Sequence, residues 1–149
     1  KFAVGINPRA PESKPFEVSR FEGNCLLTEG INDIWNKVAG VAGTAFNNAN
    51  AFLGVGNSAA AATMDDTGLL GGASIGYKAM EISYPTFGTG RQIVFRSVFA
   101  SADGNFAWNE FTVANGNSNA AVNLNRKVSV QGTKISGQSW TLTLTITLA

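Results

Sequence analysis

The chain has 149 residues, which suits one domain, and 44% of them are hydrophobic, which is enough for a buried core. Only 14% are charged and the net charge is +1, so the composition provides no clustered basic surface for a nucleic acid or an anionic membrane. The absence of histidine excludes Ser-His and Cys-His nucleophilic catalysis, and a single cysteine, Cys25, excludes an internal disulfide.

The first twenty residues are expected to form an extended arm. They contain three of the four prolines, and each proline blocks a helix and favours extended backbone in the residue before it. Large apolar residues are scattered through this segment, and we expect them to anchor the arm on a partner: Phe2, Val4, Ile6, Phe16 and Val18. A disordered tail is the alternative, although such tails carry fewer large apolar residues.

A short helix is predicted over about residues 29–39, with Thr28 as its N-terminal capping residue. Four apolar residues recur within it at the spacing of one helical face: Ile31, Ile34, Trp35 and Val38. We expect this face to pack on a sheet, which places Trp35 in the core. Gly40 follows the apolar face and is expected to end the helix.

From residue 51 onward, apolar runs alternate with Asn, Asp and Gly residues, which predicts strands joined by tight turns. The expected strands lie at about 51–55, 77–84, 92–101, 106–114, 122–131 and 140–149. Residues 57–74 lack a steady period and are interpreted as a long loop, in which a short helix at 59–64 is one alternative.

These elements predict an all-β fold, an antiparallel β-sandwich or barrel-like pair of sheets, with one short helix and an extended N-terminal arm. Residues 1–20 are assigned to the arm and residues 21–149 to a single β-rich domain.

The last ten residues carry the clearest strand pattern. Five apolar residues alternate with four threonines, so one face of the strand carries β-branched hydroxyl side chains and the other is apolar. The apolar residues are Trp140, Leu142, Leu144, Ile146 and Leu148. The segment is uncharged and contains neither Pro nor Gly. Because such a strand would recruit other chains as an open edge, we expect it to be paired on both sides or covered by a partner subunit.

Three charged residues interrupt the apolar pattern of the predicted strands: Arg96, Glu110 and Arg126. Glu110 shares a strand face with Phe106 and Trp108, so its carboxylate is expected to be buried or half-buried. A buried charge requires a partner, because its desolvation is costly. We therefore predict an ion pair between Glu110 and either Arg126 or Arg96 that fixes the register of the strands.

No group of residues has the spacing of a catalytic, cofactor-binding or metal-binding site. Asp65 and Asp66 are adjacent, so their side chains diverge in an extended segment, and the calcium-binding spacing of an EF-hand loop is absent. The glycines between 68 and 76 lack the strand-helix frame and the Lys-Ser/Thr pair of a phosphate-binding loop. We therefore predict a protein without enzymatic activity, cofactor or metal.

Three tryptophans and many asparagines leave a carbohydrate-binding β-sandwich as an alternative, because indole rings stack on sugars and amides bond to hydroxyls. This alternative requires an exposed platform built from Trp35, Trp108 and Trp140. Each tryptophan lies in line with an apolar face, which favours a place in the core.

Several segments together resemble a group of small structural virion proteins of tailed bacteriophages. They are FNNANAFLGVGNS at 46–58, the Tyr84–Pro85 turn, FAWNEFTVAN at 106–115, LNRKV at 124–128 and GTKISGQSWTLTLTITLA at 132–149. Within this group the chain is most similar to the capsid cement, or decoration, proteins.

The resemblance implies a protein that binds the outer surface of the capsid and bridges capsomers. Its implied partners are the major capsid protein and further copies of the same chain in a homotrimer. Neither a nucleic acid nor a membrane is expected as a partner, and no stretch approaches the ~18 consecutive apolar residues of a membrane span. A tail or tail-fibre component of the same virion is the alternative. A fibre is expected to contain longer repeats, so the absence of an internal repeat favours the shell.

Overall fold

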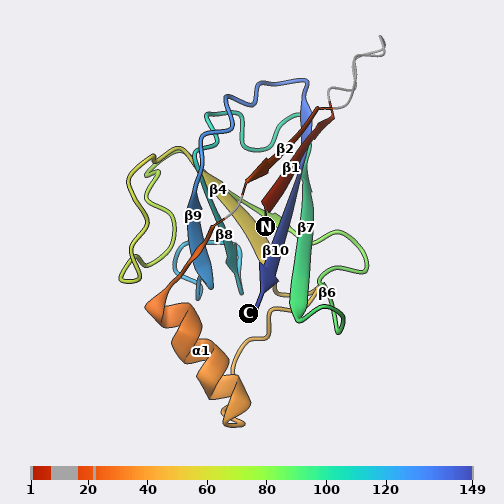
Figure 1. The fold of residues 1–149 in the computed structure, drawn as a ribbon. Helices are drawn as coiled ribbons and strands as arrows, with labels where there is room; N and C mark the ends of the chain where they lie inside the picture. The colour runs from red at the N-terminus through yellow and green to blue at the C-terminus, as the bar shows by residue number, and fades with distance from the viewer. Residues whose placement is uncertain (1, 8–16, 22, 149) are drawn as a thin grey trace.

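Two antiparallel β-sheets face each other and enclose the core (Figure 1). The computed structural model describes residues 2–7, 17–21 and 23–148. The first sheet has the order β2-β1-β10-β7-β6, with β1 (Phe2–Asn7), β2 (Glu17–Phe21), β6 (Thr86–Phe87), β7 (Gln92–Phe99) and β10 (Ser139–Thr147). The second has the order β3-β9-β8-β4-β5, with β3 (Cys25–Leu26), β4 (Phe52–Gly56), β5 (Ile75–Ala79), β8 (Glu110–Ala114) and β9 (Asn125–Val128).

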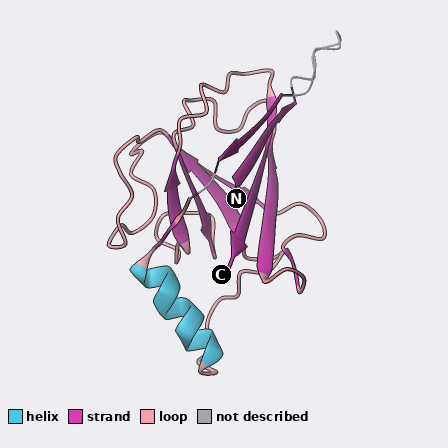
Figure 2. Ribbon diagram, in the orientation of Figure 1, coloured by secondary structure: helices cyan, strands magenta, loops and turns pink. Residues whose placement is uncertain are grey.

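All the described strand pairs are antiparallel, which confirms the predicted all-β class. The helix α1 (Thr28–Val38) lies at one end of the two sheets (Figure 2). Two hydrogen bonds connect the sheets along one side. The Glu81 amide donates to the Arg96 carbonyl at 2.9 Å, and the Ser97 hydroxyl donates to the Lys78 carbonyl at 3.1 Å.

The strand β10 lies in the middle of the first sheet. It pairs with β1 on one side and with β7 on the other, so the prediction that both of its edges are covered is confirmed. Its alternating pattern buries Trp140, Leu142 and Leu144 between the sheets, while the threonines face outward.

Aromatic rings fill one end of the core. The Trp108 ring lies edge-to-face against Phe99, with centroids 4.8 Å apart, and against Trp140, with centroids 4.9 Å apart. Such arrangements align the positive ring edge with the negative ring face and add to the gain from burial. Trp108 and Trp140 are therefore core residues, as the sequence predicts.

The N-terminal segment does not confirm an extended arm. In the structure β1 and β2 form a hairpin-like pair at the edge of the first sheet, with Val4 opposite Leu142 of β10. Of the expected anchors, Phe16 lies outside the described residues, and the side chains of Phe2, Val4, Ile6 and Val18 also lie outside what the structure describes. Of the described parts of this segment, β1 pairs with β10, the domain's own C-terminal strand, and β2 pairs with β1.

The helix lies close to its predicted bounds but packs differently. Leu27 is its N-terminal capping residue and no side chain caps the helix, so Thr28 does not play the predicted role. Ile34 of the predicted apolar face is half-buried and packs against the core, but Trp35 and Val38 remain 62% and 72% exposed, which contradicts their expected burial. The close contact is made instead by Gly30, where a side chain would collide with the backbone of Leu124.

Several strands are shorter than the sequence predicts. The strand expected at 106–114 begins at Glu110, the one expected at 122–131 is confined to β9, and the one expected at 77–84 occupies 75–79. Residues 59–64 are irregular apart from a bend at 60 and a turn that starts at 64, so the alternative of a short helix there is wrong.

Candidate functional site

A fully buried ion pair joins two neighbouring strands of the second sheet. Glu110 on β8 and Arg126 on β9 both have no exposed side-chain surface, and Arg126 Nε donates to Glu110 Oε2 at 2.7 Å. Of the two partners predicted for Glu110, Arg126 is therefore the one that the structure supplies. Arg96 lies 2.6 Å from Glu81 instead, at a half-exposed position.

The ion pair also holds the long loop at 57–74. Arg126 donates to Asp66 at 2.9 Å and to the Ala60 carbonyl at 3.0 Å. The Glu110 carboxylate accepts backbone hydrogen bonds from Leu70 at 2.9 Å and from Ser58 at 3.3 Å. Donors and acceptors at both ends of the loop thus converge on one pair of charges, which closes the loop over the sheet.

Asp66 is the member of this cluster that the sequence did not identify. Burial acts to raise its pKa, but hydrogen bonds from Thr63 and Arg126 outweigh burial, so the pKa of Asp66 lies below its ordinary value of 3.8. Asp66 therefore remains ionised at neutral pH and serves as a second counter-ion for Arg126. All of these interactions stay within the chain, and the cluster has a structural role.

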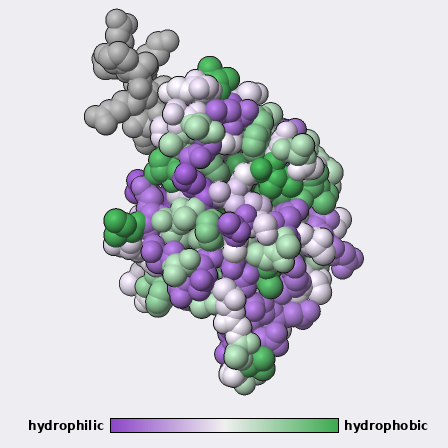
Figure 3. Space-filling view, turned by 180° about the vertical axis from the view of Figure 1, so that it is seen from behind, coloured by the Kyte–Doolittle hydropathy of each residue, from purple (hydrophilic) through white to green (hydrophobic). Residues whose placement is uncertain are grey.

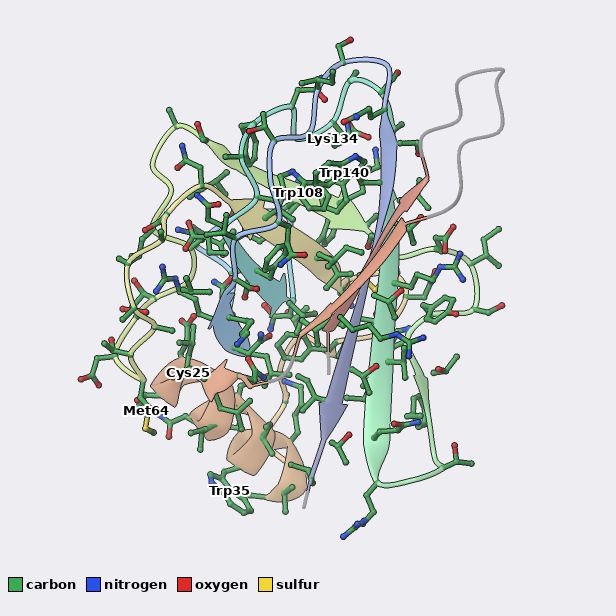
Figure 4. All side chains as sticks on the ribbon, turned by 45° about the horizontal axis from the view of Figure 1, so that its top comes forward. Cys25, Trp35, Met64, Trp108, Lys134 and Trp140 are labelled. Atoms are coloured by element: carbon green, nitrogen blue, oxygen red, sulfur yellow. The ribbon has the colours of Figure 1, made fainter. Side chains whose placement is uncertain are left out.

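A second buried charge lies at the aromatic end of the core. Lys134 has no exposed surface, and its Nζ donates to Asn105 Oδ1 at 2.7 Å and to the Ala100 carbonyl at 2.8 Å. Burial lowers the pKa of Lys134, with a smaller opposing effect of Asp103. Figure 4 shows Lys134 close to Trp108 and Trp140. Its contacts tie the segment before β10 to the turn after β7, which is again a structural role.

Amide side chains form a third internal network. The Tyr77 hydroxyl donates to Asn119 at 2.5 Å, and Asn119 in turn bonds the backbone of Leu69 through both its oxygen and its nitrogen. The backbone amide of Asn123 donates to Glu29 at 2.9 Å, which fixes the first turn of α1 to the strand region. The many asparagines of this chain thus include several that serve as internal connectors between loops.

An apolar cleft opens at the end of the sandwich that carries α1. Its volume is about 710 Å³, within the range of ~300–1,000 Å³ typical of binding pockets. Side chains from α1, from both sheets and from the segments at 45–48 and 83–87 line it, among them Leu26, Ile34, Phe46, Tyr84, Phe95 and Ile146.

The polar groups on the walls of the cleft are already engaged with one another. Lys37 forms an ion pair with Asp33 on the same helix and lies 5.5 Å from the centre of the Phe46 ring. The Asn48 amide donates to the carbonyls of Glu81 and Tyr84 at 2.8 and 2.7 Å, which joins two walls of the cleft. The cleft therefore offers apolar surface and little net charge to a ligand.

The tryptophans do not form a common platform. Trp108 and Trp140 are buried, whereas Trp35 points away from the sheets at the far end of the molecule (Figure 4). On the face opposite to that of Figure 1, hydrophobic side chains lie in small groups among hydrophilic ones (Figure 3). A carbohydrate-binding role would thus depend on the single ring of Trp35.

Cys25 lies at a half-buried position on β3. Among the residues that the structure describes, no three acidic or cysteine side chains gather closely enough to hold a metal ion. Within the same residues, α1 is too short to span a membrane.

Comparisons with protein-family models, with curated proteins and with solved structures gave no match to this chain.

Proposed function

We propose that this chain is a structural virion protein that binds the outer surface of a tailed-phage capsid as a cement protein and stabilises the shell by bridging capsomers. Its partners in this proposal are the major capsid protein and further copies of itself in a homotrimer. The resemblance of residues 46–58 and 132–149 to phage virion proteins supports the choice of the virion. The apolar cleft beside α1 is the observation that carries a binding role.

The distribution of charge supports a structural role over a catalytic one. Three charged side chains are buried and form hydrogen bonds to other groups of the same chain, including its loops: Glu110, Arg126 and Lys134. What the described surface offers to another molecule is mostly short neutral side chains and isolated large apolar ones, such as Phe87, which is 77% exposed at the mouth of the cleft. Apolar surface of this kind is typical of sites that a partner covers.

The proposal is tested by adding the purified chain to shells assembled from the major capsid protein of the same phage. We expect saturable binding at a fixed ratio to capsomers and a higher temperature of shell disruption, because a ligand that binds only the intact lattice stabilises it. The chain is used whole, since removal of residues 1–20 would strip β1 from β10 and expose a strand edge.

Absence of binding would refute the cement role. A chain that is trimeric in solution and ignores shells would point to the tail or tail fibre of the virion. A monomer that ignores shells and binds sugars through Trp35 would point to a carbohydrate-binding module.

A further inference from the structure

Two side chains that can react with each other meet at the aromatic end of the core. Lys134 Nζ is a primary amine, and it donates a hydrogen bond to Asn105 Oδ1 at 2.7 Å. The amine therefore lies against a carboxamide, whose carbon Cγ is bonded to that oxygen. A neutral amine that is held against a carbonyl carbon can attack it, because the fold has already brought the two reactants together. The pair thus holds the nucleophile and the acyl group of an amide-forming reaction.

Hydrogen bonds hold both reactants in place. The Lys134 backbone amide donates to the Phe106 carbonyl at 3.1 Å, so Lys134 lies beside the segment that carries Asn105. The Asn105 amide nitrogen, Nδ2, donates to the Ser101 carbonyl at 2.9 Å, which fixes the orientation of the carboxamide. The amine and the carboxamide are therefore positioned by the fold and not by their mutual contact alone.

The surroundings of the two groups differ in a way that favours the reaction. Lys134 has no exposed surface, and the rings of Trp108 and Trp140 lie close to it (Figure 4). Burial lowers the pKa of Lys134, so its amine is neutral more often than that of an exposed lysine. Asn105 is an exposed residue, so a nitrogen that leaves its carboxamide has access to water.

Asp103 is placed on the same turn and can accept a proton from the amine. Within the part of the chain that the structure describes, it is the charged group that acts on Lys134, and its charge favours the ammonium form. Asp103 Oδ2 accepts hydrogen bonds from Lys78 at 2.7 Å and from the Ala100 amide at 2.9 Å. The bond from Lys78 is the main cause that lowers the pKa of Asp103, so the carboxylate is ionised at neutral pH.

We propose that Lys134 and Asn105 form an intramolecular amide cross-link in the folded chain. Asp103 takes a proton from the Lys134 ammonium, and the neutral Nζ attacks Cγ of Asn105. The bond from Cγ to Nδ2 breaks, and its electron pair stays on Nδ2. Nδ2 takes up the two protons that Nζ gives up and leaves as an ammonium ion, and Asp103 is again a carboxylate. One ammonium and one carboxamide thus become one secondary amide and one ammonium ion, without an oxidant, a reductant or a further reactant.

The cross-link would join the turn after β7 covalently to the segment before β10. It leaves no amine at residue 134, so a pH dependence of stability that comes from Lys134 belongs to molecules that have not yet formed the bond. The inference is independent of the proposed function, because it concerns two residues of one chain and requires no shell.

Mass spectrometry tests the cross-link directly. The freshly purified whole chain is incubated at neutral pH, and its intact mass is followed with time. We expect a product that is lighter by one molecule of ammonia, and after digestion a pair of peptides joined between Lys134 and Asn105. The chain unfolded in urea should not form this product, because the two side chains are then no longer held together.

Three variants identify the reacting residues. Asn105→Ala removes the acyl group at an exposed position that the fold should tolerate, and Lys134→Arg keeps a cation but removes the amine. Neither variant should yield the linked peptides. Asn117→Ala is the matched control, because it removes an exposed asparagine outside the pair, and it should form the cross-link within about twofold of the wild-type rate. A thermal melt verifies that each variant is folded.

The pH dependence of the rate separates proton transfer by Asp103 from a purely structural role. In the wild type a neutral amine with a protonated carboxyl group carries the same number of protons as the ion pair, so the rate should be constant between the pKa values of Asp103 and Lys134. In Asp103→Asn the rate at neutral pH should fall on the order of a hundredfold and should then rise about tenfold per pH unit, because the amine must lose its proton to water. Lys78→Gln breaks the ion pair but keeps the carboxylate, so it should keep the constant rate.

Two results would overturn the cross-link. One is an intact mass that does not change during prolonged incubation of the folded chain. The other is a loss of ammonia without linked peptides, which would place the reaction at another asparagine, such as Asn115, where the following Gly116 favours ring closure. A rate in Asp103→Asn equal to that of the wild type would refute the part assigned to Asp103.

Discussion

Replacement of Glu110 by glutamine is expected to lower the free energy of unfolding by about 3–5 kcal/mol, the range found when one partner of a buried ion pair is removed. The substitution keeps the size of the side chain, so no cavity forms. It leaves the guanidinium of Arg126 buried with Asp66 as its one remaining counter-ion among the residues that the structure describes. It also replaces a carboxylate oxygen that accepts backbone hydrogen bonds from the loop at 57–74 with an amide nitrogen that cannot accept them.

Thermal denaturation followed by circular dichroism measures this loss. For a domain of this size, 3–5 kcal/mol corresponds to a fall in Tm of roughly 6–20 °C. Leu144→Ala removes a fully buried side chain and provides a reference of about 2–5 kcal/mol. Glu81→Gln is the matched control: it breaks a partly exposed pair with Arg96 and is expected to cost less than about 1 kcal/mol.

The reasoning also predicts where the structure loosens. Since Glu110 accepts hydrogen bonds from Ser58 and Leu70, limited proteolysis of Glu110→Gln should cut within residues 57–74 earlier than it cuts the wild type. A loss of stability no greater than that of Glu81→Gln would refute the view that the buried pair organises the second sheet and its loop.

Three further outcomes follow from the buried and exposed residues. Because burial lowers the pKa of Lys134 below its ordinary 10.5, Lys134 binds more protons in the unfolded chain in the window just below pH 10.5, so the stability of the wild type to urea relative to that of Lys134→Met should rise with pH there. Iodide should quench one accessible tryptophan component that Trp35→Phe removes, whereas quenching that survives this substitution would contradict the burial of Trp108 and Trp140. Gly30→Ala should destabilise the fold by about 1–3 kcal/mol through overpacking, although alanine favours helices, and a gain in stability would contradict the close packing of α1.

The residue pattern within one segment was sufficient to predict the features that depend on that segment alone. The alternation of Trp140, Leu142 and Leu144 with threonines identifies a strand with one buried face, because side chains in a strand alternate between its two faces. The need of a buried carboxylate for a counter-charge likewise predicted an ion pair at Glu110.

Features that depend on packing between distant segments could not be read from the sequence. The choice of Arg126 over Arg96 depends on which strands become neighbours, and the participation of Asp66 depends on how a long loop folds back. The spacing of apolar residues in α1 indicates an apolar face but does not indicate what covers that face. The prediction that Trp35 lies in the core was therefore wrong. The apolar cleft is lined by side chains from the helix and from both sheets, which no single segment encodes.

The proline-containing segment illustrates the same limit. The three prolines near the N-terminus fall between β1 and β2, not within them. Their extended bias was interpreted as an arm because nothing local distinguishes a segment that reaches outward from one that returns to the domain. Pairing with β10, more than 130 residues away, decides the matter for the described residues.

The two ends of the sandwich differ in how their apolar side chains are covered, and this difference leads to a last prediction. At one end Trp108 and Trp140 pack edge-to-face under the turn that Lys134 holds. At the other end α1 fully buries Gly30, packs Ile34 against the core and borders the apolar cleft, so few side chains hold the helix in place.

A partner bound in the apolar cleft would contact both α1, through Ile34, and β10, through Ile146. Such a ligand links the helix to the first sheet, so amide hydrogen exchange in α1 should slow when the chain binds shells, while exchange around Trp108 should stay constant because that end is already closed. Equal slowing at both ends would indicate stabilisation of the whole domain by mass action alone. Slowing confined to the closed end would refute docking at the apolar cleft, since it would place the partner on the opposite end of the sandwich.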